Sequence, residues 1–237
     1  MNVAGTYRLN GSARVARPDA AFDRLDGIGA IRHLAPHESL VLEGDSADCF
    51  HRVLSGIVAG YKATADGRRQ IVAFYFPGDL VGLTAGEHYA CGAEAVGRAS
   101  VCSVPRIRMR ELSRQSPALY EDLLLALDRE VAAAQERLLW LGRKTARERL
   151  ACFLLECADR IGEPAEDGGQ TVPLPMSQLE IGDYLGLASE TVSRALAQLA
   201  RDGAIDILRP FAGAIIRDRE RLEAATDEGT RPLCAYS

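Results

Sequence analysis

Three polar residues lie close together near the start of a periodic segment: Glu190, Ser193 and Arg194. Their side chains have the chemistry needed to read DNA bases. Arginine donates two parallel hydrogen bonds to guanine N7 and O6, glutamate accepts one from the cytosine amine, and serine pairs with either. On a helical wheel counted from Glu190, Ser193 falls at about −60° and Arg194 at about +40°. The spacing predicts one polar helix face that contacts a G·C base pair.

A purely structural explanation of the same residues is also open. Glu190 and Arg194 are four residues apart, so on a solvated helix they would form an ion pair worth about 0.2–0.5 kcal/mol. The opposite face of this helix is apolar and is expected to dock on the rest of the protein, because four apolar residues recur at helical spacing. These residues are Val192, Ala195, Leu196 and Leu199.

The surrounding residues, 177–201, have the pattern of a helix-turn-helix. Ser177 and Glu180 form a capping box that opens a first helix, and Gly186 then allows a tight turn. The second helix is expected to run from about Ser189 to Arg201, after a connection of three to four residues. Ser189 is expected to cap this helix, because Ala188 before it has no capping side chain.

A predicted β-hairpin follows the two helices. Residues 204–208 (AIDIL) and 214–218 (AIIRD) are short apolar runs joined by RPFAG, as in the wing of a winged helix-turn-helix. This hairpin favours DNA binding over the structural explanation, and we predict a winged helix-turn-helix domain over residues 143–218. Four further residues are predicted to contact the DNA backbone or to support the site: Ser177, Ser189, Thr191 and Arg147.

A long helix is predicted over residues 116–142, before this domain. Its apolar residues recur at steps of four and three, the spacing of a coiled-coil seam. We predict a dimerisation helix, although packing of the same stripe on the chain's own body is the alternative. The seam residues are Leu127, Val131, Ala134, Leu138 and Leu141. A capping box at Thr145 and Glu148 opens the next helix, and residues 162–169 are predicted to be a polar linker.

The N-terminal half is a series of short apolar runs separated by turn signals. Gly44, Gly56, Asp66-Gly67 and Pro77-Gly78 recur at the spacing of antiparallel strands. Residues 21–115 therefore predict a small β-barrel or sandwich, and the whole chain an α+β protein. Residues 1–20 are expected to be a flexible arm and residues 219–237 a C-terminal tail.

Composition limits the functions open to this chain. It has 237 residues, of which 28 are Lys or Arg and 33 are Asp or Glu, so the net charge is −5. A negative net charge does not favour binding to DNA or to an anionic membrane by overall electrostatic attraction. Binding to DNA would therefore depend on a few individual basic residues, such as Arg143, Lys144 and Arg147. No apolar run approaches the roughly 18 residues of a membrane helix. No secretory signal or disulfide framework is visible, so we expect a cytoplasmic location.

The sequence resembles the CRP/FNR superfamily of bacterial transcription regulators over nearly its whole length. SADCFHRVLSGIV and ADGRRQIVAFYFPGDLVGL resemble its effector barrel, a jelly roll of the cyclic-nucleotide-binding type, and IGDYLGLASETVSRALAQL resembles its recognition unit. The E-x-x-S-R arrangement of Glu190, Ser193 and Arg194 is that of the FNR and FixK branch. The resemblance implies a homodimeric activator that reads a TTGAT-N4-ATCAA palindrome, contacts RNA polymerase and controls low-oxygen respiratory genes.

Departures from that family bear on the signal. Cys91-Gly92-Ala93-Glu94 stands where cyclic-nucleotide binders carry an Arg-Ser or Arg-Thr pair, and a glutamate there would repel phosphate. We therefore predict no cyclic-nucleotide binding. Residues 1–48 contain no cysteine, so an iron-sulfur cluster of the FNR kind cannot form. No cofactor, no metal site and no enzymatic site is predicted. The alternative is a regulator gated by a small molecule, a metal or a thiol in the barrel, the candidate thiols being Cys49, Cys91 and Cys102.

Overall fold

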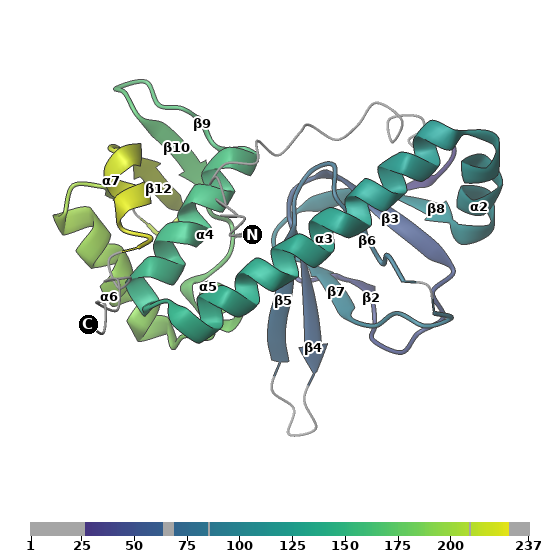
Figure 1. Cartoon of the computed structure of the whole chain (residues 1–237), viewed down its shortest axis with the longest axis horizontal. Helices are drawn as coiled ribbons and strands as arrows, with labels where there is room; N and C mark the ends of the chain where they lie inside the picture. Colours follow the sequence, from purple (N-terminus) through teal and green to yellow (C-terminus); the bar gives the residue numbers. More distant parts are fainter. Residues whose placement is uncertain (1–26, 64–68, 85, 209, 228–237) are drawn as a thin grey trace, which may run out of the picture.

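The computed structural model describes residues 27–63, 69–84, 86–208 and 210–227. A β-rich unit and a helix-rich unit lie at the two ends of a long diagonal helix, α3 (Pro117–Arg143), as Figure 1 shows. The fold is α+β, as expected. The predicted arm, residues 1–20, lies outside the described residues. None of the helices in the described part of the chain combines the length and the apolarity needed to cross a bilayer.

The N-terminal unit is a jelly roll of two four-stranded antiparallel sheets. The sheet orders are β1-β8-β3-β6 and β2-β7-β4-β5. Strands β4 and β5 form the hairpin expected around Asp66-Gly67, with Ala63 paired to Arg69, although the turn itself lies outside the described residues. The strands are β1 (Ala30–Leu34), β2 (Ser39–Val41), β3 (Cys49–Ser55), β4 (Val58–Ala63), β5 (Arg69–Tyr75), β6 (Leu80–Val81), β7 (Gly92–Ala95) and β8 (Ala99–Pro105).

The barrel interior contains one buried histidine, His51, with both ring nitrogens in hydrogen-bonding range of a hydroxyl. Nδ1 lies 2.9 Å from Ser103 Oγ and Nε2 lies 3.1 Å from Tyr89 OH. Burial, together with the positive charge of Arg32, lowers the pKa of His51 to about 4. The ring is therefore neutral in the folded protein at pH 7.

This histidine predicts a loss of stability in mild acid. The unfolded chain binds a proton near pH 6.5 and the folded chain only near pH 4, so stability falls as pH falls through that window. Between pH 7 and pH 5 the free energy of unfolding should drop by about 2 kcal/mol more in the parent than in His51→Gln, which cannot titrate. Urea unfolding at the two pH values measures this difference. Parallel pH dependences in the two proteins would contradict it.

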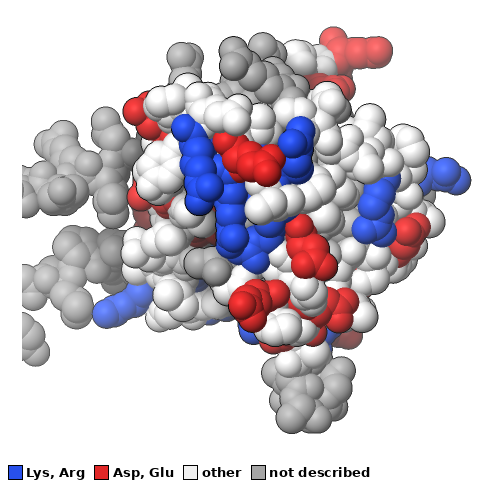
Figure 2. Space-filling view, turned by 90° about the vertical axis from the view of Figure 1, so that its right-hand side faces the viewer, with Lys and Arg blue, Asp and Glu red and all other residues white. Residues whose placement is uncertain are grey.

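A short helix, α2 (Arg106–Gln115), covers the far end of the barrel. This helix was not expected, because its residues were placed in the predicted β-barrel, residues 21–115. It carries four arginines, Arg106, Arg108, Arg110 and Arg114. Figure 2 looks onto this end of the molecule and shows a group of basic side chains mixed with acidic ones. Helix α2 lies at the opposite end of the molecule from α6 (Figure 1), so the arginines of α2 do not assist a DNA contact made by α6.

The long helix α3 has two apolar faces. Leu119, Leu123 and Ala126 belong to the cluster that packs against α2 and strand β8 of the barrel. The other face carries the five predicted seam residues and is exposed: Leu127 is 42% exposed, Val131 55% and Leu138 70%. Tyr120 and Leu124, also exposed, extend the same four-three spacing toward the N-terminus. The barrel therefore packs on a different stripe and leaves the predicted seam uncovered.

The C-terminal unit packs its helices on a small sheet of order β11-β12-β10-β9. The expected wing is β11 with β12, and both capping boxes are present, at Thr145 with Glu148 and at Ser177 with Glu180. The elements are α4 (Ala146–Ile161), β9 (Glu163–Pro164), β10 (Gln170–Pro173), α5 (Gln178–Leu185), α6 (Ser189–Arg201), β11 (Ile205–Leu208), β12 (Gly213–Ile216) and α7 (Arg219–Ala224).

Two segments of this unit differ from the sequence expectation. Residues 162–169 were expected to be a linker, but Glu163 and Pro164 pair with β10 and the intervening residues turn the chain back. The segment from residue 219 was expected to be a tail, but residues 219–224 form α7, because Leu222 and the following Ala225 are buried in the core. Residues 162–169 are rich in glycine and acidic residues, which is typical of a loop, and α7 has a mostly charged surface. Neither segment therefore shows the apolar pattern of a strand or a helix. Residues 228–237 lie outside the described residues.

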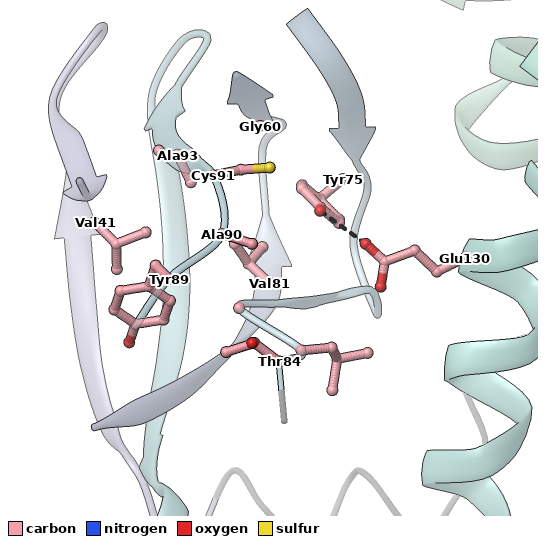
Figure 3. Close-up of a pocket in the computed structure, with 13 residues that line it drawn as sticks. Val41, Gly60, Tyr75, Val81, Thr84, Tyr89, Ala90, Cys91, Ala93 and Glu130 are labelled. Carbon is pink, nitrogen blue, oxygen red and sulfur yellow. Dashed lines mark hydrogen bonds between the residues drawn. The ribbon is translucent and has the colours of Figure 1, made fainter. Parts of the chain in front are cut away.

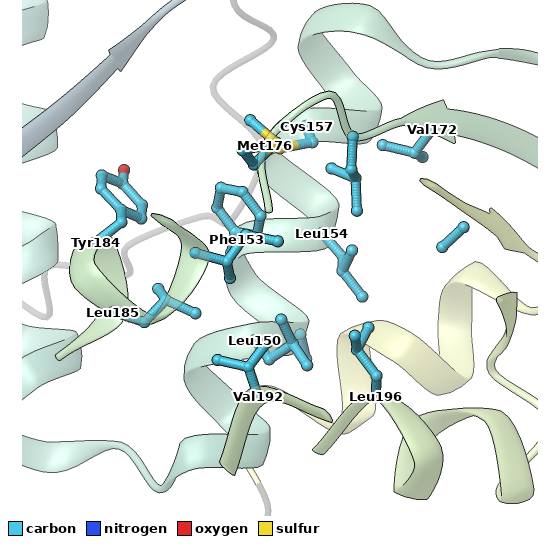
Figure 4. Packing of buried hydrophobic residues seen from close by; sticks show 14 of the residues in the cluster. Leu150, Phe153, Leu154, Cys157, Val172, Met176, Tyr184, Leu185, Val192 and Leu196 are labelled. Atoms are coloured by element: carbon cyan, nitrogen blue, oxygen red, sulfur yellow. The ribbon is translucent and has the colours of Figure 1, made fainter. Parts of the chain in front are cut away.

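One apolar cluster joins the two units. The rings of Phe74 from the barrel, Phe153 from α4 and Tyr184 from α5 lie 4.9–6.0 Å apart, centroid to centroid. The Arg137 guanidinium of α3 lies 4.5 Å from the centre of the Tyr184 ring. Figure 4 shows the C-terminal part of this cluster, in which Val192 and Leu196 of α6 point toward Leu150 of α4. The position of α6 is thus coupled through packed side chains to the barrel.

Candidate nucleic-acid interface

The first helix of the helix-turn-helix is fixed at both ends by its own sequence. At its start, Ser177 Oγ accepts from the Glu180 N–H at 3.2 Å, and Glu180 Oε2 accepts from the Ser177 N–H at 2.8 Å. At its end, Gly186 adopts φ 65°, a left-handed conformation that favours glycine. Gly182 allows the two helices to meet, because a Cβ there would lie 2.5 Å from the Leu187 carbonyl oxygen. These residues set the angle at which α6 leaves the turn.

The second helix, α6, is divided into a buried face and an exposed face. Val192, Ala195, Leu196 and Leu199 are at most 3% exposed, as the wheel predicted. Glu190, Ser193 and Arg194 are all exposed, near the N-terminal end. Packing of the apolar face on α4 and α5 therefore holds three polar side chains together on open surface.

The exposed residues do not form the structural ion pair considered above. Among the ion pairs of the described residues, none joins Glu190 to Arg194. Arg194 Nε instead donates to the Glu190 carbonyl at 3.3 Å, and its Nη2 donates to Thr191 Oγ1 at 3.3 Å. Both bonds are long and solvent-exposed, so the guanidinium can leave them for a stronger bidentate acceptor.

Known proteins resemble this chain over both units. Residues 148–225 match the model of the Crp-like helix-turn-helix domain, and residues 31–116 match that of the cyclic nucleotide-binding domain. The nitrogen fixation regulation protein FixK of Bradyrhizobium diazoefficiens is 36% identical over 214 residues, covering 90% of this chain and 89% of that protein. This chain belongs to the CRP/FNR superfamily, in its FixK-like branch.

Two further similarities agree with this assignment. FixK of Rhizobium meliloti is 37% identical over 199 residues, covering 84% of each chain. The solved structure of FixK2 from Bradyrhizobium japonicum superposes with a TM-score of 0.76 at 37% identity, covering 84% of this chain and 97% of that chain. The expected fold and the expected class, a DNA-binding transcription regulator and not an enzyme, are confirmed.

Three of the residues predicted to contact the DNA backbone or to support the site lie on the two helices of the helix-turn-helix of this FixK-like chain. Ser177 is exposed at the start of α5, and Thr191 lies beside Arg194. Ser189 is the first residue of α6 and not its cap; the N-cap is Ala188, which makes no side-chain bond. The prediction that Ser189 caps α6 was wrong. A helix capped by Ser189 would begin at Glu190, whereas α6 begins at Ser189 itself.

The cations expected near DNA are mostly used inside the protein. Arg147 Nη2 donates to Asp202 Oδ2 at 2.7 Å and its side chain is only 18% exposed, so it ties α4 to the end of α6. This ion pair is compatible with the supporting role predicted for Arg147, and its contact with the DNA backbone stays a prediction. Lys144 donates to the Thr226 carbonyl at 2.7 Å and pairs with Asp227, whereas Arg143 is exposed. Arg201, which was not among the predicted site residues, is exposed on the same face of α6, seven residues after Arg194.

The barrel of this CRP/FNR member contains a small cavity next to α3. Its volume is about 90 Å³, and its lining includes Tyr75, Tyr89, Cys91 and Glu130. Figure 3 shows Tyr75 of β5 turned toward Glu130 of α3, and its hydroxyl donates to Glu130 Oε1 at 3.1 Å. Burial raises the pKa of the Glu130 carboxyl. None of the lining residues that the structure describes is basic.

The three cysteines considered as redox thiols are in unfavourable surroundings. Burial raises the pKa of Cys91, and burial together with the charge of Asp48 raises the pKa of Cys49. Cys102 is fully buried in strand β8. Reactive thiols are exposed and have a lowered pKa, because the thiolate is the reacting species. The surroundings of these residues therefore oppose the hypothesis of thiol regulation.

Proposed function

We propose that this FixK-like regulator binds DNA as a homodimer and reads a TTGAT-N4-ATCAA palindrome through the exposed residues of α6. One observation carries the proposal: Glu190, Ser193 and Arg194 are exposed together near the start of α6, while the apolar face of the helix is buried. In this assignment Arg194 donates to guanine, Glu190 accepts from cytosine and Ser193 adapts to the neighbouring base. Ser177, exposed at the start of α5, is assigned a contact with the DNA backbone or a supporting role.

The dimer is supported by the uncovered face of α3. A four-three apolar stripe from Tyr120 to Leu141 faces solvent in the single chain, and a second copy of the helix would bury it. Two-fold symmetry then places the two α6 helices in successive major grooves about 34 Å apart, which matches a palindrome. Because both DNA-binding domains of the dimer would contact the same duplex, each domain needs few positive charges of its own for binding.

The proposed role in activation is supported by the names of the relatives. FixK of Bradyrhizobium diazoefficiens is named as a nitrogen fixation regulation protein, and AadR of Rhodopseudomonas palustris as a transcriptional activatory protein. We propose activation of low-oxygen respiratory genes, through a contact with RNA polymerase. A cyclic nucleotide is not the signal in this proposal, because the cavity is far below the about 300–1,000 Å³ of pockets that enclose such ligands, and its one charged residue, Glu130, would repel phosphate.

A second candidate is the same regulator gated by a small ligand in the barrel. The Tyr75–Glu130 hydrogen bond connects the cavity to α3, and this contact could transmit occupancy to the dimer helix. Calorimetry with cyclic nucleotides and visible absorption spectra of protein purified with and without oxygen separate the two. Heat of binding or a chromophore would favour gating.

Fluorescence anisotropy tests the leading proposal. A labelled TTGAT-N4-ATCAA duplex is titrated with the full chain at 150 mM salt and compared with a scrambled duplex of equal length. Specific binding is expected to be at least about 10³-fold tighter than non-specific binding. A third duplex, with five base pairs added between the half-sites, rotates one half-site by about half a helical turn and should lose that advantage. Equal affinity for all three duplexes would overturn the proposal.

A further inference from the structure

Three residues distant in sequence converge where the barrel meets the DNA-binding unit. His37 and Glu94 come from the barrel, and Glu180 is the third residue of α5. One ligand atom from each lies within 4.8 Å of the others, and His37 Nδ1 is 4.0 Å from Glu180 Oε1. Two atoms each about 2.1 Å from one ion lie at most about 4.2 Å apart, so a small side-chain rotation brings all three onto a common ion.

The barrel holds its two ligands in a fixed relation. His37 adopts φ 61°, the left-handed conformation, in the turn between β1 and β2. Its N–H donates to the Ala95 carbonyl at 2.8 Å, and the Ala95 N–H donates to the Glu38 carbonyl at 3.0 Å. These bonds tie the turn to the strand that carries Glu94. The imidazole is 62% exposed, which leaves an entry path from solvent.

The ligand from the DNA-binding unit is a buried carboxylate with one unused oxygen. Glu180 is 4% exposed. Its Oε2 accepts from the Ser177 N–H and from Ser177 Oγ, both at 2.8 Å, which fixes the carboxylate. Its Oε1 is buried and has no hydrogen-bond donor among the described residues. Such an oxygen costs free energy unless a cation or donor reaches it, and the capping box directs it toward His37.

The local charge favours a divalent cation. Glu94, Glu180 and Asp183 together carry −3, and Arg69 contributes +1, so the group has a net charge of −2. Arg69 Nη1 pairs with Glu94 Oε1 at 2.5 Å, and its Nε lies 4.0 Å from Asp183 Oδ2. Burial raises the pKa of Asp183, Arg69 opposes this, and the charge of Glu180 adds to it. The carboxylates therefore outnumber the cations that face them.

We propose that His37, Glu94 and Glu180 bind a divalent first-row transition metal ion, such as Mn²⁺ or Zn²⁺, between the barrel and the DNA-binding unit. One imidazole nitrogen with two carboxylates is a donor set that such ions accept, and water completes the shell. Because the ligands come from both units, the ion stabilises the arrangement in which α5 packs on the barrel. No metal site was expected from the sequence, because residues 37, 94 and 180 are far apart along the chain.

A titration of the full chain with Mn²⁺, without DNA, tests the site. Electron paramagnetic resonance of free Mn²⁺ gives stoichiometry and affinity, and Mn²⁺ avoids the thiolates that would attract softer ions. We expect one ion per chain in the parent and at least a 10-fold weaker affinity in His37→Asn. Asparagine tolerates the left-handed conformation of His37, so this variant keeps the turn. The matched control is His33→Asn, since His33 is an exposed histidine on β1.

The outcomes are distinct. A parental affinity in His33→Asn with a loss in His37→Asn and in Glu180→Gln supports the site, as does a Mn²⁺-dependent rise in melting temperature that His37→Asn lacks. Equal affinity in the parent and His37→Asn, or no binding of one ion per chain, overturns it. Because no DNA is present, failure of this site leaves the proposed DNA reading untouched, and the reverse also holds.

Discussion

Replacing Arg194 by alanine should weaken binding to the palindrome by about 1–3 kcal/mol per half-site contact, about 5- to 150-fold. A symmetric duplex has two half-sites, and each loses its contact with one Arg194 of the dimer. The total loss of affinity for this duplex is therefore larger than the loss at one half-site. Binding to scrambled DNA should change much less, because Arg194 is assigned to a base edge and not to phosphate. Anisotropy titrations of parent and variant on both duplexes at one salt concentration measure the two effects.

Arg201→Ala is the matched control for this prediction. Arg201 is also an exposed arginine of α6, seven residues further along and distant from the N-terminal end that enters a groove. Its loss should reduce affinity for both duplexes by a similar, smaller factor. Equal effects of the two variants on the specific duplex would show that α6 contributes charge and not base reading.

Leu138→Glu should convert the proposed dimer to monomers. Leu138 is 70% exposed in the single chain and lies on the four-three stripe. Burial of a leucine contributes about 1.5–3 kcal/mol, and the two-fold axis counts each substitution twice, so the dimer dissociation constant should rise by about 10²- to 10⁴-fold. Sedimentation velocity over a concentration series measures it, and specific DNA binding should fall with it.

Leu139→Glu supplies the comparison for this effect. Leu139 is adjacent in sequence and 52% exposed, but it lies off the stripe. The same change of charge and volume there should leave the dimer intact. If both variants dissociate equally, or neither does, α3 is not the interface, and the alternative of a different dimer contact gains support.

Local sequence rules predicted the DNA-binding unit well for a physical reason. The capping boxes, the glycine turn and the apolar face of α6 depend on residues that follow one another at steps of at most four positions, so short-range pattern and structure agree. The exposed seam of α3 was visible for the same reason. The hairpin of β9 with β10 and the helix α7 were not visible, because β10 is held in the sheet by its long-range pairing with β12, and burial of Leu222 fixes α7.

The roles of single charged residues were harder to predict than the helices that carry them. Nothing in the sequence near Arg147 indicated an ion-pair partner, yet its guanidinium donates a hydrogen bond to Asp202, 55 residues away. The convergence of His37, Glu94 and Glu180 depends on how two units pack, and no spacing in the sequence shows it. Contacts across the boundary between units are set by the shared aromatic cluster, which reading either half alone cannot reveal.

The coupling between Arg194 and one G·C pair tests the central claim most directly. A double-mutant cycle combines the parent and Arg194→Ala with the palindrome and a duplex in which that pair is replaced by A·T in both half-sites. Base reading by α6 predicts a coupling energy of about 1–3 kcal/mol per half-site, so the variant no longer discriminates between the duplexes. A coupling energy near zero, with full discrimination kept by the variant, would contradict the assignment of α6 as the element that reads the sequence.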